Sequence, residues 1–186
     1  ISITFNGEIY NYRELKKKLK NKGHKFSTKS DTEVILKTYI EYGIDCPKYL
    51  DGMFAFAIWD EDKQSLFLAR DRFGKKPLYY AQTGGELIFG SEIKSLIEHP
   101  SLKNNEIDPR ALDLYLTYQA IPSPLTIYKN IKRLPPATFL IAHDGYVSEP
   151  KQYWSLDFNS KFTGHRQEAQ EKILELLNQS TKERLI

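Results

Sequence analysis

The chain has 186 residues, of which 40% are hydrophobic and 13% aromatic, enough for one substantial core. Its net charge of +3 comes from 27 basic and 24 acidic residues that are scattered along the sequence, so nucleic acid is not expected as a partner. No apolar run approaches the roughly 20 residues that span a bilayer, and one cysteine offers no disulfide framework, so we expect a cytoplasmic protein and no membrane partner.

The first predicted element is a strand over residues 1–5, where apolar and polar side chains alternate. Asn6 and Gly7 follow at its expected end. The dipeptide alone favours a tight hairpin turn, because both residues tolerate positive φ. The alternative is an oxyanion site, in which the Asn6 carboxamide and the Gly7 N–H stabilise an oxygen that becomes negatively charged.

Two helices are predicted next. The first covers Tyr10 to Lys22 with Asn11 as its N-cap, and the second begins after Ser30, where Ser30 and Glu33 have the spacing of a capping box. Asp31 then lies in the first helical turn, where the helix dipole favours a carboxylate. It either stabilises the helix or serves as a partner for an ammonium group.

The only cysteine, Cys46, is predicted to be a small buried core residue. Apart from Lys48, no basic side chain is its neighbour in sequence to lower the pKa of the thiol. We therefore assign Cys46 no catalytic role.

Four strands joined by tight turns follow. Residues 53–59 are uniformly apolar, which predicts a strand buried on both faces and hence a layer on each side of its sheet. The other three strands are predicted at 66–69, 78–80 and 87–89. The charged run Arg70–Arg72 is interpreted as structural pairing.

The rest of the chain alternates short helices with a hairpin. Ser91 is a candidate cap for a short helix, and Asp108 with Pro109 begins a longer one. A hairpin is predicted across residues 143–145. The second helix is expected to bury four side chains: Ala111, Leu112, Tyr115 and Leu116. The four histidines are isolated, which argues against a metal site or a Ser-His-Asp triad.

Residues 159–164 are polar and without periodicity, which predicts a linker. From about residue 165 to 184 the sequence is helical, with an apolar stripe that has little of the chain left to pack on. The stripe consists of Ile173, Leu176, Leu177 and Leu185.

Six segments, taken in order, resemble the glutaminase domain of glutamine-dependent asparagine synthetases, which belong to the class II glutamine amidotransferases. They are FNGEIYNYRELKKKL, SDTEVILKTY, LDGMFAFAIWD, ARDRFGKKPLYY, FGSEIKSL and RLPPATFL. The resemblance implies an α+β fold, a four-layer αββα Ntn-hydrolase sandwich that is N-terminally truncated. It also implies three parts: a glutaminase domain over 1–158, a linker over 159–164, and the first helix of an α/β synthetase domain over 165–186.

The resemblance implies an enzyme that releases ammonia from L-glutamine and transfers it to ATP-activated aspartate, forming asparagine, AMP and pyrophosphate. Asn6 and Gly7 match the oxyanion-hole positions of the family, whereas Glu8 and Asp31 match groups that hold the amino end of glutamine. In the family, the nucleophile is an N-terminal cysteine that lies upstream of the Asn-Gly motif. An arginine that binds the substrate carboxylate also lies upstream of this motif. This chain begins with Ile1, so we expect the fragment alone to be inactive.

The resemblance implies no cofactor for these residues, with ATP and Mg²⁺ expected in the missing synthetase domain. A homodimer is compatible with it. Two alternatives stay open: a related class II amidotransferase that amidates another carboxylate, and a non-catalytic module that binds glutamine or a protein partner.

Overall fold

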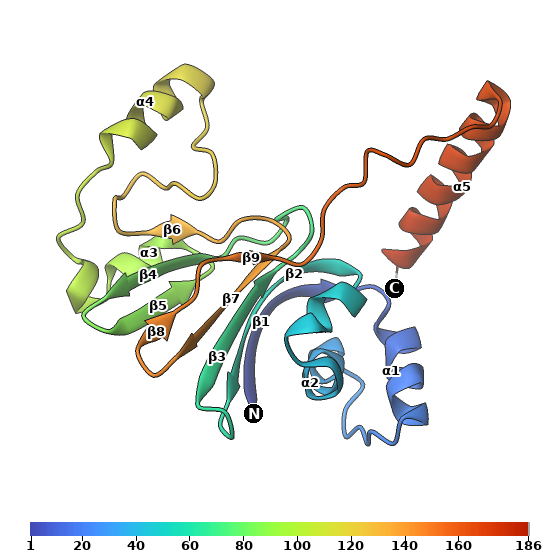
Figure 1. The fold of residues 1–186 in the computed structure, drawn as a ribbon, viewed down its shortest axis with the longest axis horizontal. Coiled ribbons are helices and arrows are strands. Elements are labelled where there is room, and N and C mark those ends of the chain that lie inside the picture. The colour runs from blue at the N-terminus through green and yellow to red at the C-terminus, as the bar shows by residue number, and fades with distance from the viewer. Residues whose placement is uncertain (186) are drawn as a thin grey trace.

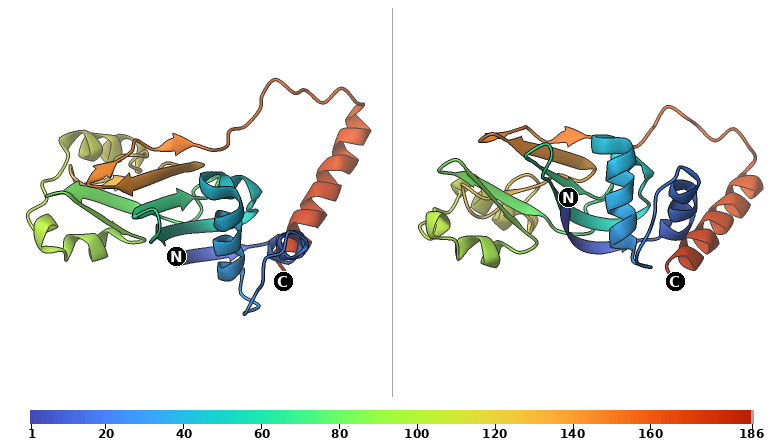
Figure 2. Two further views of the ribbon diagram at one scale, coloured as in Figure 1. Left: turned by 60° about the horizontal axis from the view of Figure 1, so that its bottom comes forward. Right: turned by 90° about the horizontal axis from the view of Figure 1, so that it is seen from below.

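Two antiparallel sheets are stacked face to face between two layers of helices in the computed structural model, which describes residues 1–185 (Figures 1 and 2). Helices α1 and α2 cover the outer face of the larger sheet, and α3 covers the outer face of the smaller one. The predicted four-layer αββα arrangement is confirmed. No helix in the described part combines the length and apolar character that a membrane crossing requires.

The larger sheet has six strands in the order β1-β2-β3-β7-β8, with β9 paired to β7. All of its pairings are antiparallel. Its strands are β1 (Ser2–Ile9), β2 (Gly52–Asp60), β3 (Ser65–Arg70), β7 (Thr138–His143), β8 (Tyr146–Val147) and β9 (Lys151–Gln152). The predicted hairpin across residues 143–145 is confirmed as β7 and β8.

The smaller sheet has the order β5-β4-β6. Its strands are β4 (Tyr79–Thr83), β5 (Glu86–Gly90) and β6 (Lys132–Arg133). The four strands predicted between residues 53 and 89 are therefore divided, two in each sheet. The chain passes from one sheet to the other after β3.

The helical segments lie between and after the strands. They are α1 (Tyr12–Asn21), α2 (Asp31–Tyr42), η1 (Gly43–Tyr49), α3 (Ile93–Ile97), η2 (Pro100–Leu102), α4 (Pro109–Tyr118) and α5 (Arg166–Glu183).

Helix α1 begins two residues later than predicted. Asn11 precedes it, but its side chain does not cap the helix. Instead, the carboxamide donates to the Tyr49 carbonyl oxygen at 2.9 Å and accepts from the Asp51 N–H at 3.0 Å. Asn11 therefore fixes the chain just before β2, a long-range role that helix capping rules do not capture.

Helix α2 begins as predicted, because Ser30 Oγ accepts a hydrogen bond from the Thr32 N–H at 3.1 Å. The other half of the predicted capping box is wrong. The Glu33 carboxylate accepts hydrogen bonds from the N–H groups of Ser27 and Thr28 and from the Thr28 hydroxyl, rather than from Ser30. The loop before α2 is thereby tied to its first turn.

The residue at the N-cap position of α3 is Glu92 rather than the predicted Ser91, and the Glu92 side chain makes no capping hydrogen bond. Helix α4 has the predicted Asp108 cap, which accepts from the Arg110 N–H at 2.9 Å. Its predicted buried face is wrong, because only Ala111 is buried. The other three members are exposed: Leu112, Tyr115 and Leu116. Helix α4 extends beyond the smaller sheet, so none of the described elements covers that face (Figure 1).

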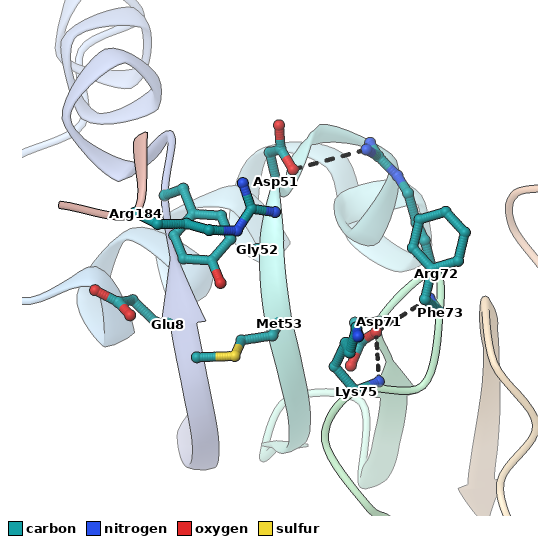
Figure 3. A pocket seen from close by; sticks show the side chains of 10 residues that line it. Glu8, Asp51, Gly52, Met53, Asp71, Arg72, Phe73, Lys75 and Arg184 are labelled. Carbon is teal, nitrogen blue, oxygen red and sulfur yellow. Dashed lines mark hydrogen bonds and ion pairs between the residues drawn. The ribbon is translucent and has the colours of Figure 1, made fainter. Parts of the chain in front are cut away.

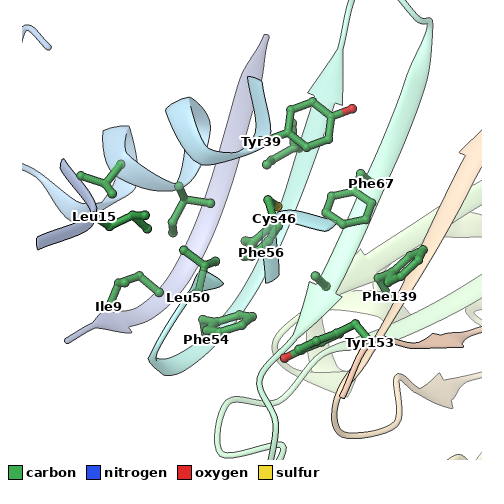
Figure 4. Packing of buried hydrophobic residues seen from close by; sticks show 14 of the residues in the cluster. Ile9, Leu15, Tyr39, Cys46, Leu50, Phe54, Phe56, Phe67, Phe139 and Tyr153 are labelled. Atoms are coloured by element: carbon green, nitrogen blue, oxygen red, sulfur yellow. The ribbon is translucent and has the colours of Figure 1, made fainter. Parts of the chain in front are cut away.

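Strand β2 is buried on both faces, as its apolar run predicts. Its even-numbered side chains pack with α1 and α2 in the main core, which Figure 4 shows from close by. Its odd-numbered side chains Ala55 and Ala57 pack toward the smaller sheet, against Leu78 and Tyr80. Because successive side chains of a strand point to opposite faces of the sheet, β2 contributes side chains to both cores.

Arg70 and Asp71 are structural residues, as predicted, but each bonds to backbone groups rather than to the other. The Arg70 guanidinium donates to three carbonyl oxygens, those of Gly74, Lys76 and Leu134. The Asp71 carboxylate accepts from four N–H groups, those of Phe54, Phe73, Lys75 and Lys76. This frame holds the crossing between the two sheets.

Helix α5 confirms the helix predicted after residue 165, and its apolar side chains are exposed. An extended segment leads to it from β9, so that the end of α5 lies beside α1 (Figure 1). There the Arg184 guanidinium lies 4.6 Å from the centre of the Tyr10 ring. Whether α5 belongs to a separate domain stays a prediction.

Candidate functional site

Strand β1 continues through the Asn-Gly dipeptide instead of ending before it. All eight of its residues pair with β2, and Asn6 lies opposite Ala55 and Gly7 opposite Phe54. The expectation that Asn6 sits at a strand end is therefore wrong, and so is the hairpin alternative. Pairing along the whole length of β2 overrides the local preference of Asn-Gly for a turn.

Gly7 is required by the close approach of β1 to β2. Its φ is +152°, and a Cβ atom at this position would lie 2.1 Å from the Met53 carbonyl oxygen and 2.8 Å from Phe54 Cα. Backbone atoms cannot move aside as the end of a flexible side chain can. Any larger residue at this position must therefore distort the pairing of the two strands.

The Gly7 N–H points to the open edge of the sheet. Among residues 1–185, β1 is an edge strand, and the Tyr10 N–H donates to the Asp51 carbonyl oxygen at 2.7 Å. Because hydrogen-bonded and non-hydrogen-bonded pairs alternate in an antiparallel ladder, the even-numbered residues of β1 bond to β2. Gly7, opposite Phe54, belongs to the other set. Its N–H is therefore directed away from β2, where a substrate oxygen can approach.

The Asn6 side chain lies on the face of the sheet opposite α1 and α2. Its Nδ2 donates to Ser91 Oγ at 3.3 Å, and both residues line a cavity of about 360 Å³ between the two sheets. Of the described residues that line this cavity, none is charged. A carboxamide hydrogen bond is stronger in such surroundings than in water.

Glu8 shares a face with Asn6 but lines a different cavity, of about 470 Å³ (Figure 3). This second cavity contains charges of both signs. Besides Glu8, its charged residues are Asp51, Asp71, Arg72, Lys75 and Arg184. Among them, Arg72 and Asp51 approach each other to 3.9 Å. A ligand that carries both an ammonium and a carboxylate group would find a partner of opposite charge for each.

Asp31 is attached directly to the end of β1. Its Oδ2 accepts a hydrogen bond from the Ile9 N–H at 3.1 Å, and its other oxygen accepts from the Ser30 hydroxyl at 3.4 Å. The carboxylate therefore occupies the open edge of β1, two residues beyond Gly7. The structure places Asn6, Gly7 and Glu8 on one strand and connects Asp31 to it, although Asn6 and Glu8 face separate cavities.

The described residues provide no cysteine nucleophile. Cys46 is fully buried, as predicted, and burial raises the pKa of its thiol well above the ordinary value. Its thiolate, the reactive form, is correspondingly disfavoured. Within residues 1–185, no group of three or more His, Cys, Asp or Glu side chains is arranged to hold a metal ion.

Sequence reasoning missed one residue of this site. Ser91 was interpreted only as a helix cap, yet its hydroxyl contacts the Asn6 carboxamide across 85 positions of sequence. No local pattern signals this contact, because it forms only when the smaller sheet packs on the larger one.

Comparison with known proteins gives the following similarities. A family model described as a glutamine amidotransferase domain matches residues 1–154. Asparagine synthetase (glutamine-hydrolyzing) 3 of Bacillus subtilis is 42% identical over 158 residues, which are 84% of this chain and 25% of that protein. Amidase chry2 of Gibberella zeae is 32% identical over 163 residues, 87% of this chain and 23% of that protein. The chain thus spans about a quarter of the length of these relatives.

Solved structures show the same fold. Glutamine phosphoribosylpyrophosphate amidotransferase from B. subtilis, complexed with ADP and GMP, has a TM-score of 0.59 at 21% identity, over 82% of this chain and 29% of that one. The allosteric regulatory enzyme of purine biosynthesis also has a TM-score of 0.59, at 22% identity, over 84% of this chain and 29% of that one. The sequence similarities confirm the family resemblance predicted from the six segments. The structural similarities confirm the predicted Ntn-hydrolase sandwich.

Proposed function

The chain belongs to the glutamine amidotransferase domain family, and on that premise we propose that it forms the substrate-binding part of a glutamine-hydrolysing site. L-Glutamine lies along the open edge of β1. Its side-chain amide is next to Asn6 and Gly7, and its amino group is toward Glu8 and Asp31.

The arrangement of β1 carries this proposal. Two hydrogen-bond donors, the Asn6 carboxamide and the Gly7 N–H, are followed along the strand by two carboxylates, those of Glu8 and of Asp31 at Ile9. Two strand residues span about 7 Å. The carbon chain of glutamine can bridge such a length, with its carbonyl oxygen at the donors and its ammonium group at the carboxylates.

The chemistry proposed for this edge is acyl transfer. A thiolate attacks the side-chain carbonyl carbon of glutamine, and the carbonyl oxygen becomes an oxyanion that Asn6 and Gly7 stabilise. The carbon–nitrogen bond then breaks and ammonia leaves with an added proton. Water hydrolyses the resulting thioester to glutamate and restores the thiol. Because Cys46 is buried, we propose that the thiolate comes from outside residues 1–185.

The acceptor of the ammonia is a further part of the proposal. The asparagine synthetase relatives support transfer to aspartate activated by ATP and Mg²⁺ in a synthetase domain. We propose that this domain begins at residue 165, after a linker over 159–164, and that α5 is its first helix. The alternative that another carboxylate is amidated stays a second candidate, because the similarity extends to a relative not named as an asparagine synthetase, amidase chry2. The single, buried cysteine supports a cytoplasmic location for the whole protein.

The test is ammonia release from glutamine by the complete protein that carries this chain. Replacing Asn6 by Ala should lower kcat by about 10²–10³, because one oxyanion donor is lost. The matched control is Asn21→Ala, at an exposed residue of α1, which should leave kcat unchanged. We expect the 186-residue chain alone to release no ammonia.

Two results would contradict the proposal. The first is ammonia release by the chain alone, which would place the nucleophile within it. The second is a complete protein that binds glutamine in calorimetry without hydrolysing it, which would favour the non-catalytic module.

A further inference from the structure

The carboxamide of Asn6 needs a second contact if it is to direct a hydrogen bond at a substrate. The terminal torsion of an asparagine side chain is broad and roughly two-fold, so a carboxamide without a partner samples many directions. Its two N–H bonds lie in one rigid plane. A hydrogen bond to one of them therefore sets the direction of the other.

The structure supplies this contact from the other sheet. Ser91 Oγ accepts a hydrogen bond from Asn6 Nδ2 at 3.3 Å, in partly buried surroundings. Among residues 1–185 it is the one hydrogen bond of this carboxamide. The second N–H of Nδ2 is thereby left for a ligand. The uncharged lining of the adjoining cavity offers no stronger competitor for the carboxamide.

The position of Ser91 is itself well fixed. It directly follows β5, whose last residue Gly90 pairs with Tyr79, and it precedes Glu92 at the N-cap position of α3. A Cβ atom on Gly90 would lie 2.9 Å from Leu96 Cδ1, so the strand end and the helix are closely packed. Ser91 therefore stands on a short segment held by both the smaller sheet and α3.

We propose that Ser91 is the positioning residue of the oxyanion donor: its hydroxyl holds the Asn6 carboxamide so that the second N–H meets the oxygen of the glutamine amide in the transition state. Ser91 does not touch the substrate and acts through Asn6. This role rests on the proposed glutamine hydrolysis, and it makes the packing of the smaller sheet a condition for the activity of the larger one.

The test uses the complete protein and steady-state glutamine hydrolysis. Ser91→Ala should lower kcat by about tenfold to a hundredfold, since a misplaced catalytic group costs up to about that much. KM should change by less than about threefold, because the interaction is made in the transition state. Ser91→Thr retains the hydroxyl and should restore most of kcat. Ser95→Ala is the matched control, because the Ser95 hydroxyl bonds only to the Glu92 carbonyl oxygen nearby.

A double-mutant cycle separates positioning from a general structural effect. If Ser91 acts through Asn6, Ser91→Ala should have no further effect on kcat in an Asn6→Ala background. An equal loss in both backgrounds overturns the proposal, as does a Ser91→Ala enzyme with wild-type kcat. If the wild-type protein does not hydrolyse glutamine, the proposed function fails first, and this inference fails with it. Thermal unfolding of each variant identifies any loss of kcat that comes from misfolding.

Discussion

The two faces of the larger sheet are built from side chains of different size. The face toward α1 and α2 carries large aromatic rings, those of Phe54, Phe56, Phe67 and Phe139. The face toward the smaller sheet carries Ala55 and Ala57 from the same strand that supplies two of these rings. The aromatic face forms most of the core, whereas the small side chains let the second sheet approach and leave a cavity beside Asn6.

The two faces therefore have different roles: the aromatic face determines the stability of the fold, and the face with small side chains determines the chemistry at Asn6. Substitutions on the aromatic face or in the pairing of β1 with β2 should change the free energy of unfolding. Substitutions on the face with small side chains should change the chemistry at Asn6 while the fold persists.

The largest effect is expected at Gly7, where the backbones of β1 and β2 lie close together. Gly7→Ala places a methyl group 2.1 Å from the Met53 carbonyl oxygen. It should lower the free energy of unfolding by about 5 kcal/mol, which is enough to prevent the folding of many domains. Gly84→Ala is the control. It has a positive φ but open space around it, and should cost only about 1–2 kcal/mol. Urea unfolding of both variants checks this, and equal costs would contradict the steric argument.

The aromatic face should show the next largest effect. Phe67 is 1% exposed and its ring contacts the rings of Tyr39, Phe56 and Phe139. Phe67→Ala should therefore cost about 4 kcal/mol through lost burial and the cavity that remains. Phe158, which is 72% exposed, provides the matched control, and its replacement by Ala should change the free energy of unfolding by less than about 0.5 kcal/mol.

Much of this architecture was predictable from local patterns. The uniformly apolar run in β2 predicted a strand covered on both sides, and the Ser30 cap and the Asp108-Pro109 pair located two helix starts. The path of β1 was not predictable. Asn6-Gly7 favours a turn locally, and only pairing with β2 over eight residues keeps it extended.

The residues of the site were predictable from the sequence, whereas their arrangement in space was not. Resemblance to a family supplied Asn6, Gly7, Glu8 and Asp31, whose roles remain predictions. The hydrogen bond from Ile9 to Asp31 and the contact of Ser91 with Asn6 depend on packing between distant segments, so no sequence pattern indicates them.

Ala55→Leu tests the face with small side chains. Ala55 is the pairing partner of Asn6 and lines the same cavity, so a leucine there crowds the carboxamide. We expect kcat for glutamine hydrolysis by the complete protein to fall by about tenfold or more. The free energy of unfolding should fall by about 1–3 kcal/mol, because Ala55 is buried and a larger side chain displaces its neighbours in part. Loss of stability without loss of kcat would contradict the division between the two faces.

The smallest effect is expected outside both faces, in the loop that leads to α2 and Asp31. The Thr28 hydroxyl and the N–H groups of Ser27 and Thr28 donate to the Glu33 carboxylate and lower its pKa from 4.5 to about 2. Because the pKa in the folded state is below the unfolded value, the ionised carboxylate stabilises the fold above pH 4.5. This stabilisation is lost as the pH falls from 4.5 toward 2.

Glu33→Gln should therefore reduce the change in urea midpoint between about pH 6 and about pH 3. Glu98→Gln is the matched control, since Glu98 is exposed and accepts no side-chain hydrogen bond within residues 1–185. Its pH dependence should equal that of the wild type. If Glu33→Gln also retains the full wild-type dependence, the loop is not held by this carboxylate, and the start of α2 depends on the Ser30 cap alone.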